Sequence, residues 1–452
     1  MSVSRKSDPS TAGRPAANTP APPGPDEQFD IGATPDSIDR MRELYGRYGD
    51  VYRVYSPGRK SWTYVLNNPD DVKRVLLSNH RNYTKGIGLD RVKILLGNGI
   101  MVSEGDFWKK QRYMMQPMFH RRVIERFESM IADANEALIE RWRGHAARGE
   151  PVDVTDAMSQ LTLDIVLRSI LGTDLARLSA QAGGNPFEVV TREQERNLQF
   201  AYKFRSLTKL VAQVVQQRRA EARDEFDFLG MLMNARDKES GEPMGERVLI
   251  DEVMTLVVAG HETTASALNW TWYLLSQHPE VEARLHAELD AARDIGDRTF
   301  NALDQLPYTQ QVIHEALRLY PPGWLLSRRS IGADRLGGYD IAPQTDILIS
   351  PYFIHRNVDH WSEPESFRPE RFAPAALAAR HRFAYIPFAV GPRHCIGENF
   401  ALFEMVLHLY EVARRFRLKF TTTEPLPVEA AINLRTRNNL FMTLEPRAIR
   451  SA

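Results

Sequence analysis

The sequence contains one cysteine, Cys395, in surroundings that suit a metal-binding thiolate. Glycines stand at positions 391 and 397, Arg393 lies just before the cysteine, and an apolar-periodic helix is predicted directly behind it, over residues 398–416. A thiol at the start of a helix meets unpaired backbone N–H groups and the positive end of the helix dipole, and both favour the thiolate. A lone cysteine is more often a small buried hydrophobe, so the surrounding pattern must decide between the two interpretations.

A second candidate site lies inside a long predicted helix, residues 246–277, in the stretch Ala259-Gly-His-Glu-Thr-Thr264. Glycine in a helix interior costs about 1 kcal/mol relative to alanine. A threonine hydroxyl can also bond a carbonyl one turn back and bend the helix. The stretch is therefore a weak point that carries an acid, Glu262, beside an alcohol, Thr263. The alternative interpretation is a tolerated glycine with polar neighbours facing solvent.

Two further pairs share a helix face. Trp108 and Arg112 stand four residues apart, and the indole N–H and guanidinium both suit a carboxylate. Taken alone, this pair predicts a core tryptophan beside a surface arginine. Glu315 and Arg318 stand three residues apart, and a surface pair of this kind contributes less than about 1 kcal/mol. His314-Glu315 begins like a zinc-binding H-E-x-x-H motif, but Arg318 stands where the second histidine belongs.

Phe388, Gly391, Arg393, Cys395 and Gly397 fill every fixed position of the pattern F-x-x-G-x-R-x-C-x-G. This stretch resembles the haem-thiolate loop of the cytochrome P-450 superfamily, and the chain resembles its soluble, bacterial-type members. Four other motifs of that superfamily precede the loop in the expected order: W-x-x-x-R, A-G-x-E-T-T, E-x-x-R and P-E-R-F. Each short motif is weak alone, but their ordered occurrence argues against coincidence.

The resemblance implies a role for each matching residue. Cys395 is expected to be the axial ligand of the iron of haem b, and Glu262 and Thr263 are expected to relay protons. Glu315, Arg318 and Arg371 are expected to form a buried structural network. The residues expected to contact the haem are Trp108, Arg112, Arg328, Phe388, Arg393, Cys395 and Gly397, with Arg329 as the alternative to Arg328 and His394 as a further candidate.

The implied function is insertion of one oxygen atom from dioxygen into a hydrophobic small molecule, by hydroxylation or epoxidation. The alternatives are a haem-thiolate peroxygenase or isomerase, and a non-catalytic haem protein that binds a ligand. Such peroxide-using or isomerising relatives often lack the acid–threonine pair. The residues expected to line the substrate pocket are Ile100, Met101, Val258, Ala259, Trp324 and Leu325, with ordinary core packing as the alternative for the residues from Trp324 on.

Electrons are expected to come from NAD(P)H through a separate ferredoxin or flavodoxin with its reductase, because the haem fold takes up nearly all of the chain. Lys109, Lys110, Arg121 and Arg122 are near the helix expected to flank the cysteine side, where they would attract an acidic partner. A solvated basic face is the alternative.

The composition limits the class of protein. The chain has 452 residues, balanced charge and one cysteine, which gives no sign of nucleic-acid binding, excludes an intrachain disulfide and fits a reducing cytoplasm. No apolar run is long enough for a membrane anchor, and a monomer is expected. Residues 1–28, rich in Pro, Ala and Ser, predict a disordered tail, and residues 29–452 are expected to form a single cytochrome P-450 domain.

The resemblance implies a mainly α-helical fold with small β regions, and hydrophobic periodicity predicts the individual elements. Residues 176–222 are expected to contain two helices, which in the family form a mobile lid over the substrate, and this region looks shorter than usual. The other predicted helices cover residues 37–48, 70–78, 121–142, 154–171, 310–319 and 398–416, and the predicted strands cover residues 51–56, 62–66, 339–341, 346–350, 418–421 and 439–444.

Overall fold

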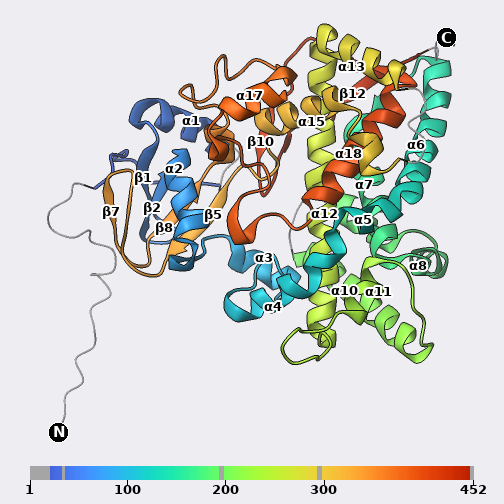
Figure 1. The fold of residues 1–452 in the computed structure, drawn as a ribbon, viewed down its shortest axis with the longest axis horizontal. Helices are drawn as coiled ribbons and strands as arrows, with labels where there is room; N and C mark the ends of the chain where they lie inside the picture. The colour runs from blue at the N-terminus through green and yellow to red at the C-terminus, as the bar shows by residue number, and fades with distance from the viewer. Residues whose placement is uncertain (1–20, 33–35, 193–197, 293–297, 448–452) are drawn as a thin grey trace.

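The computed structural model describes residues 21–32, 36–192, 198–292 and 298–447. Helices make up most of it, and the largest sheet lies with α1 and α2 at one end, away from the helices that surround α12 (Figure 1). The sheet with strand order β4-β12-β9 instead contacts α6, α7 and α12. The mainly α-helical fold class is therefore confirmed. Part of the predicted tail, residues 1–20, lies outside the described residues. Within residues 21–28, the Pro23 carbonyl accepts from the Arg53 N–H of the first strand (2.9 Å).

The helix boundaries follow the predicted periodicity closely. The α-helices are α1 (Ser37–Tyr48), α2 (Pro69–Lys73), α3 (Leu89–Leu96), α4 (Gly105–Met115), α5 (Arg121–Ile124), α6 (Glu128–Arg148), α7 (Val154–Leu171), α8 (Asp174–Ala182), α9 (Val189–Arg192), α10 (Leu198–Ala220), α11 (Phe228–Asn234), α12 (Glu246–Gln277), α13 (Pro279–Ala291), α14 (Phe300–Leu303), α15 (Pro307–Leu319), α16 (Pro351–Ile354), α17 (Pro374–Ala379) and α18 (Glu398–Ala413). Glycine ends several of them; Gly149, at the end of α6, has the left-handed φ of 65° that favours this residue.

The largest sheet has the strand order β1-β2-β8-β5-β3, in which β2 and β8 are parallel and the other neighbours are antiparallel. The β10–β11 hairpin contacts α12, so it reaches the helix that carries the acid–threonine pair. The strands are β1 (Val51–Ser56), β2 (Ser61–Leu66), β3 (Tyr83–Lys85), β4 (Val152–Asp153), β5 (Leu326–Ser330), β6 (Asp334–Leu336), β7 (Tyr339–Ile341), β8 (Asp346–Ile349), β9 (Phe416–Phe420), β10 (Val428–Ala430), β11 (Leu434–Thr436) and β12 (Phe441–Pro446).

Helix α12 crosses the helical part of the molecule and packs against α7, α10, α15 and α18 (Figure 1). It crosses α7 at Gly260, where an added Cβ would lie 2.8 Å from Cγ2 of Val166. Because that separation is shorter than van der Waals contact, the glycine lets the two helices approach closely. This packing accounts for a residue that the helix would otherwise disfavour.

The predicted lid region folds as α8 and α10 with the short α9 between them; residues 193–197 lie outside the described residues. A fully buried arginine, Arg218 on α10, ties these helices to the start of α11. Its Nε lies 2.5 Å from Asp174 Oδ2, and its Nη2 lies 2.6 Å from Asp227 Oδ2. Both carboxylates are also buried, so this ion-pair network holds the C-terminal end of α10 in place.

Candidate active site

The loop before α18 is held tightly around Cys395. The cysteine N–H donates to the Phe388 carbonyl (2.9 Å), and Ala389 and Gly391 have left-handed φ values of 58° and 77°. A Cβ at Gly391 would lie 2.0 Å from the carbonyl oxygen of Leu76, so only glycine fits there. A non-glycine residue in this conformation costs about 1–3 kcal/mol and persists only where the surroundings impose it. The loop therefore presents the sulfur in one fixed place.

The surroundings of Cys395 differ from those of a side chain packed in the hydrophobic core. Its side chain is accessible to solvent, yet protein surrounds it closely enough for burial to raise the pKa of the thiol. Both hold if the sulfur faces an internal cavity. The N–H groups of Gly397 and Glu398 lower the pKa, as does the Arg112 cation, but burial outweighs them. The helix start thus favours the thiolate, as expected, but burial opposes it more strongly, and a bound metal ion would stabilise the thiolate.

The middle of α12 also faces an open space. Residues 252–257 and 266–272 are buried on all sides, whereas Val258, Ala259, Glu262 and Thr263 are only half-buried. The Thr263 hydroxyl donates to the Ala259 carbonyl (2.7 Å), as its type predicts. Helix α12 nevertheless stays continuous through this weak point.

The acid beside this threonine has a partner from a distant segment. Asn433 Nδ2, in the turn of the β10–β11 hairpin, donates to Glu262 Oε2 (3.1 Å). The side chain of Glu262 is therefore directed toward the hairpin. Nothing in the sequence around Glu262 indicates this contact, because the two residues are far apart along the chain.

Four cations gather between α4, β3, β5 and the cysteine loop. Arg112 Nη1 donates to the His394 carbonyl (2.8 Å), and Arg393 Nη1 donates to the Ser103 carbonyl (2.8 Å). Burial lowers the pKa of each of them, and lowers that of Arg393 to about 10. The other two members, Lys85 and Arg328, have pKa values lowered first by burial as well.

This cluster is short of negative charge. Glu104 forms an ion pair with Arg393 and accepts the Lys85 N–H (2.7 Å), and Glu252 also acts on Lys85, but these are two carboxyl groups beside four basic side chains. Partly desolvated cations that repel one another are costly unless anions accompany them. The two propionates of a haem supply that charge, so the residues present fit the group that the sequence predicts.

The structure distinguishes the two candidate arginines on β5. Arg329 donates two hydrogen bonds to the Asp346 carboxylate, with Nε–Oδ1 and Nη2–Oδ2 distances of 2.7 and 2.9 Å. Arg328 is directed into the cation cluster, where Glu104 is the carboxylate that raises its pKa against burial. Of the two arginines, Arg328 is therefore the one that lies beside the other cations of the cluster.

Trp108 lies beside the same cluster, and an arginine covers one face of its indole ring. The Arg393 guanidinium lies over the indole ring, with Cζ 3.7 Å from the ring centroid. The pair thus contributes a cation–π contact in addition to any hydrogen bond that the indole donates. Phe388 and Gly397 flank the sulfur, and Gly397 Cα faces it without a side chain; a Cβ there would lie 4.0 Å from Cys395 Sγ.

Lys85 is a residue that the sequence prediction missed. It ends the short strand β3, its Nζ donates to the Ile100 carbonyl (3.2 Å), and burial together with Arg393 lowers its pKa to about 7. A lysine in a three-residue strand carries no signal of its own. Its position beside Arg328 becomes visible only through the pairing of β3 with β5.

The Glu315–Arg318 pair on α15 is fully buried, not a surface pair. Arg318 Nε and Nη2 donate to the two Glu315 oxygens at 2.7 and 2.8 Å. Arg371 Nε lies 3.2 Å from Glu315 Oε1. The remaining Arg318 donors reach the carbonyls of His355, Pro364 and Ser366. The three residues named from the sequence thus meet in one buried network.

His355 extends this network to the cysteine loop and was not predicted. Its carbonyl accepts from Arg318, and its Nε2 accepts the Ile386 N–H (2.8 Å). The Ala389 N–H in turn donates to the Ile386 carbonyl (3.0 Å). Burial lowers the pKa of His355 well below its ordinary value, so the ring is neutral and can accept that hydrogen bond.

The residues predicted to line the pocket differ in burial. Ile100, Met101 and Leu325 are half-buried, as are Val258 and Ala259 on α12. Trp324 is 1% exposed and packs in the core beneath the β10–β11 hairpin, where its Nε1 donates to the Ala431 carbonyl (2.9 Å). The core alternative therefore holds for Trp324, which does not face the pocket.

Two neighbouring acids of α12, half-buried Asp251 and buried Glu252, hold the segment that contains Ile100. Asp251 accepts the Asn98 N–H (2.8 Å), and Glu252 Oε2 accepts the Ile100 N–H (2.9 Å). Burial raises the pKa of Glu252 to about 8, so this carboxyl is mostly protonated at neutral pH. With Lys85 on the Ile100 carbonyl, the segment is anchored through its backbone.

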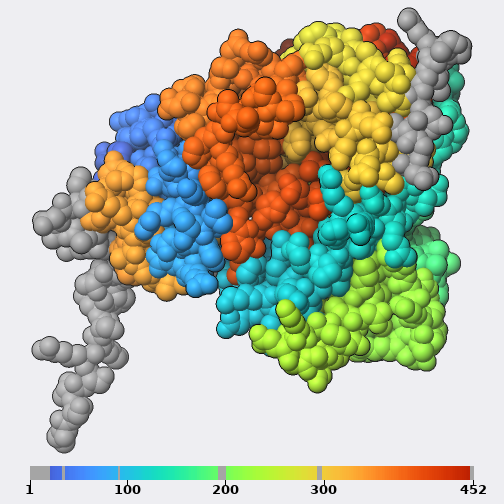
Figure 2. All heavy atoms as spheres, viewed as in Figure 1, coloured from blue at the N-terminus to red at the C-terminus, as the bar shows by residue number. Residues whose placement is uncertain are grey.

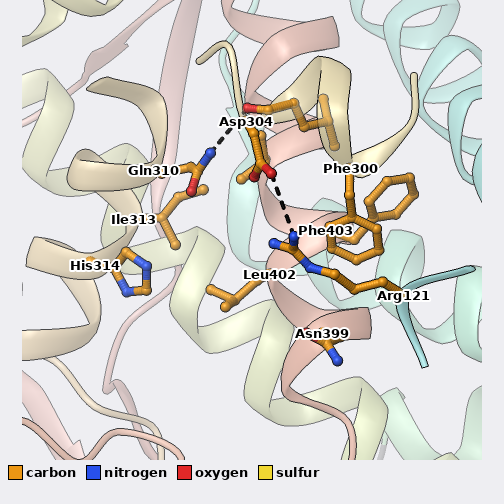
Figure 3. A pocket seen from close by; sticks show the side chains of 11 residues that line it. Arg121, Phe300, Asp304, Gln310, Ile313, His314, Asn399, Leu402 and Phe403 are labelled. Atoms are coloured by element: carbon orange, nitrogen blue, oxygen red, sulfur yellow. Dashed lines mark hydrogen bonds and ion pairs between the residues drawn. The ribbon is translucent and has the colours of Figure 1, made fainter. Parts of the chain in front are cut away.

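A separate cavity of about 50 Å³ lies among α14, α15 and the start of α18. Arg121 points across it toward Asp304 (3.4 Å), and Asn399 and His314 lie along its wall (Figure 3). It is too small for a haem and does not contain Cys395. In Figure 2 the orange and red C-terminal segment occupies the centre of one face, between the blue N-terminal part and the cyan segment around α4.

A family model described as Cytochrome P-450 matches residues 28–183 and 184–443. The chain belongs to the cytochrome P-450 family. This P-450 is 31% identical to Protein LUTEIN DEFICIENT 5, chloroplastic, from Arabidopsis thaliana, over 90% of the chain and 74% of the relative. It is 33% identical to cyclooctatin synthase and to cyclooctat-9-en-7-ol 5-monooxygenase of Streptomyces melanosporofaciens, covering 85% and 82% of the chain and 84% and 83% of those proteins.

A solved structure of a cytochrome P-450DA heme domain superposes with a TM-score of 0.82 at 24% identity, covering 95% of this chain and 98% of that one, which confirms the fold. Membership and the monooxygenase relatives together make this P-450 a haem-dependent monooxygenase. Among the helices in the described part of the chain, none combines the length and the apolar character that crossing a membrane requires.

Proposed function

We propose that this P-450 hydroxylates or epoxidises a hydrophobic, unsaturated small molecule, with haem b held by Cys395. The observation that carries the proposal is the solvent-accessible Cys395 sulfur; together with the half-buried middle of α12, it supports a cavity between the cysteine loop and that helix. When bound, a thiolate-ligated haem supplies the activation of dioxygen. The protein supplies the ligand, the cations for the propionates and an apolar wall that includes Ile100 and Met101.

The substrate class rests on that wall and on the relatives. Pentalenene oxygenase of Streptomyces avermitilis (30% identical) and carotene epsilon-monooxygenase of Arabidopsis thaliana (28% identical) carry alkenes in their names. An apolar wall binds such molecules by removing their surface from water. The spin-state change of the ferric protein, titrated with cyclic alkenes and with saturated fatty acids, tests this assignment. Tighter binding of the fatty acids would contradict it.

Glu262 and Thr263 are proposed to move protons into the cavity. The Thr263 hydroxyl has one proton, now donated to the Ala259 carbonyl, and keeps its lone pairs to accept from a water in the cavity. Rotation about its Cα–Cβ bond would redirect that proton. Glu262 is half-buried and lies next in the chain, so its carboxyl can exchange protons with solvent and pass them on.

Replacing Thr263 with alanine is expected to uncouple electron use from product formation. Electrons are still consumed, but the product formed per NAD(P)H falls at least several-fold, because a positioned proton donor contributes about 10²–10⁴ in rate. Thr271→Ala is the matched control: its hydroxyl donates to the Ala267 carbonyl at the same 2.7 Å, within the core. Equal coupling in Thr263→Ala and wild type would contradict the relay.

The electron donor is proposed to be an acidic redox protein, a ferredoxin or flavodoxin, that is reduced from NAD(P)H and docks beside α4. Lys109 and Lys110 are exposed on this helix, which also carries Arg112 to the cysteine loop. Each lysine already has an acidic neighbour, Asp106 at 2.7 Å and Asp237 at 3.7 Å. The partner must therefore compete with weak surface ion pairs.

Charge reversal of Lys109 and Lys110 to glutamate is expected to slow reduction by such a partner several-fold and to weaken its salt dependence, because steering between opposite charges is lost. Stopped-flow reduction at several ionic strengths measures both effects. Lys419→Glu, on strand β9, is the control for total charge. Unchanged kinetics would show that the two lysines are neutralised within the chain.

A further inference from the structure

We infer that Asn433 is a positioning residue for the proton relay, and that the β10–β11 hairpin sets the direction of the Glu262 carboxylate. This inference rests on the proposed relay role of Glu262. The contact itself is direct, since Asn433 Nδ2 donates to Glu262 Oε2 at 3.1 Å, and both residues are half-buried. A neutral amide donor stabilises the ionised carboxylate without removing its ability to accept a proton.

The hairpin is fixed to the same face of α12 that carries Glu262. Ser266, one turn after Glu262, donates from its hydroxyl to the Leu434 carbonyl (2.5 Å). Asn269, nearly one turn further, donates to the Thr436 hydroxyl (3.0 Å). The hairpin therefore lies along α12, and its turn, residues 431–433, ends at the acid. A turn anchored in this way can hold an amide in one place.

The same hairpin is also bonded to the segment that precedes β5. The Leu434 N–H donates to the Pro322 carbonyl (2.9 Å), and Trp324 Nε1 donates to the Ala431 carbonyl (2.9 Å). Leu325, the next residue, is half-buried and belongs to the proposed pocket wall. The β10–β11 hairpin is therefore bonded both to Glu262 and to the segment that leads into the proposed pocket wall. A substrate bound against that wall would act on the same hairpin that orients Glu262.

Three variants separate this positioning role from a merely structural one. In Asn433→Ala, product formed per NAD(P)H is expected to fall several-fold, while the dissociation constant from the spin-state titration stays within about twofold. In Asn433→Asp, a second carboxylate faces Glu262, and like charge disfavours ionisation. The pH profile of coupling should therefore shift to higher pH. Arg435→Gln, which removes an exposed arginine paired with Glu429 on the same hairpin, should change neither.

The double variant Glu262→Gln/Asn433→Ala decides whether Asn433 acts through Glu262. If it does, adding Asn433→Ala to Glu262→Gln causes no further loss. Equal losses in Asn433→Ala and Arg435→Gln, additive losses in the double variant, or an unshifted pH profile in Asn433→Asp would overturn the inference and leave the relay intact. Full coupling in Glu262→Gln would overturn the relay and, with it, the role of Asn433.

Discussion

Replacing Cys395 with serine is expected to abolish the red-shifted Soret band that the reduced, carbon monoxide-bound protein shows when a thiolate ligates the iron. Cys395 is the only cysteine in the chain, and its accessible sulfur sits in a loop that the Phe388 carbonyl and Gly391 hold in place. A serine hydroxyl keeps the shape of the side chain but is far less acidic than a thiol, so it cannot reproduce the electron donation of the thiolate.

The measurement is an absorption difference spectrum at equal haem content, with turnover recorded in parallel. Met101→Leu is the control, because it removes a half-buried sulfur from the proposed pocket wall and should keep the band. Persistence of the band in Cys395→Ser, or its absence from the wild-type protein, would remove the basis of the proposed function. Loss of the band with full turnover would show that the thiolate is dispensable for the chemistry.

Replacing Arg318 with methionine is expected to cost about 3–5 kcal/mol in the free energy of unfolding, because Glu315 remains as a buried charge without its main partner. Typical domains have only about 5–15 kcal/mol in total. The loss also removes donors from three carbonyls of the segment before the cysteine loop. We expect little folded, haem-containing protein, and a strongly lowered denaturation midpoint for what remains.

Arg435→Met is the matched control for this variant. Arg435 and Glu429 form the same kind of pair at the same Nε–Oε2 distance of 2.7 Å, but on the surface, where such a pair contributes less than about 1 kcal/mol. Chemical denaturation of both variants gives the comparison. Similar losses would show that Glu315 can be neutralised or solvated without Arg318, and that the network does not hold the loop.

The sequence predicted the parts of the site whose signal is local. Cys395, the Glu262–Thr263 pair and the Glu315–Arg318 pair were identified by residue type and spacing, and the helices around them by their periodicity. Lys85, His355 and Asn433 could not be found in this way, because each acquires its role from a partner far along the chain. Tertiary contact supplies that information, and no short pattern contains it.

Two features of the site depend on the whole fold and not on the neighbouring residues. The stretch around Trp324 is apolar without alternation, so its sequence does not show which side chain faces the core and which the pocket. At Cys395, local geometry favours the thiolate, but burial by the whole fold raises the pKa of the thiol. In both cases the three-dimensional surroundings of the residue have a larger effect than its neighbours in the sequence.

The anchoring of Ile100 by backbone atoms alone has a consequence for how such enzymes diversify. Its N–H and carbonyl are held by Glu252 and Lys85, so the course of the main chain does not depend on what is attached at that position. Exchanging the side chains of Ile100 and Met101 can then widen, narrow or reshape the chamber at little cost to folding. These two sites are where new catalytic repertoires can be selected, or built by directed evolution, on an unchanged scaffold.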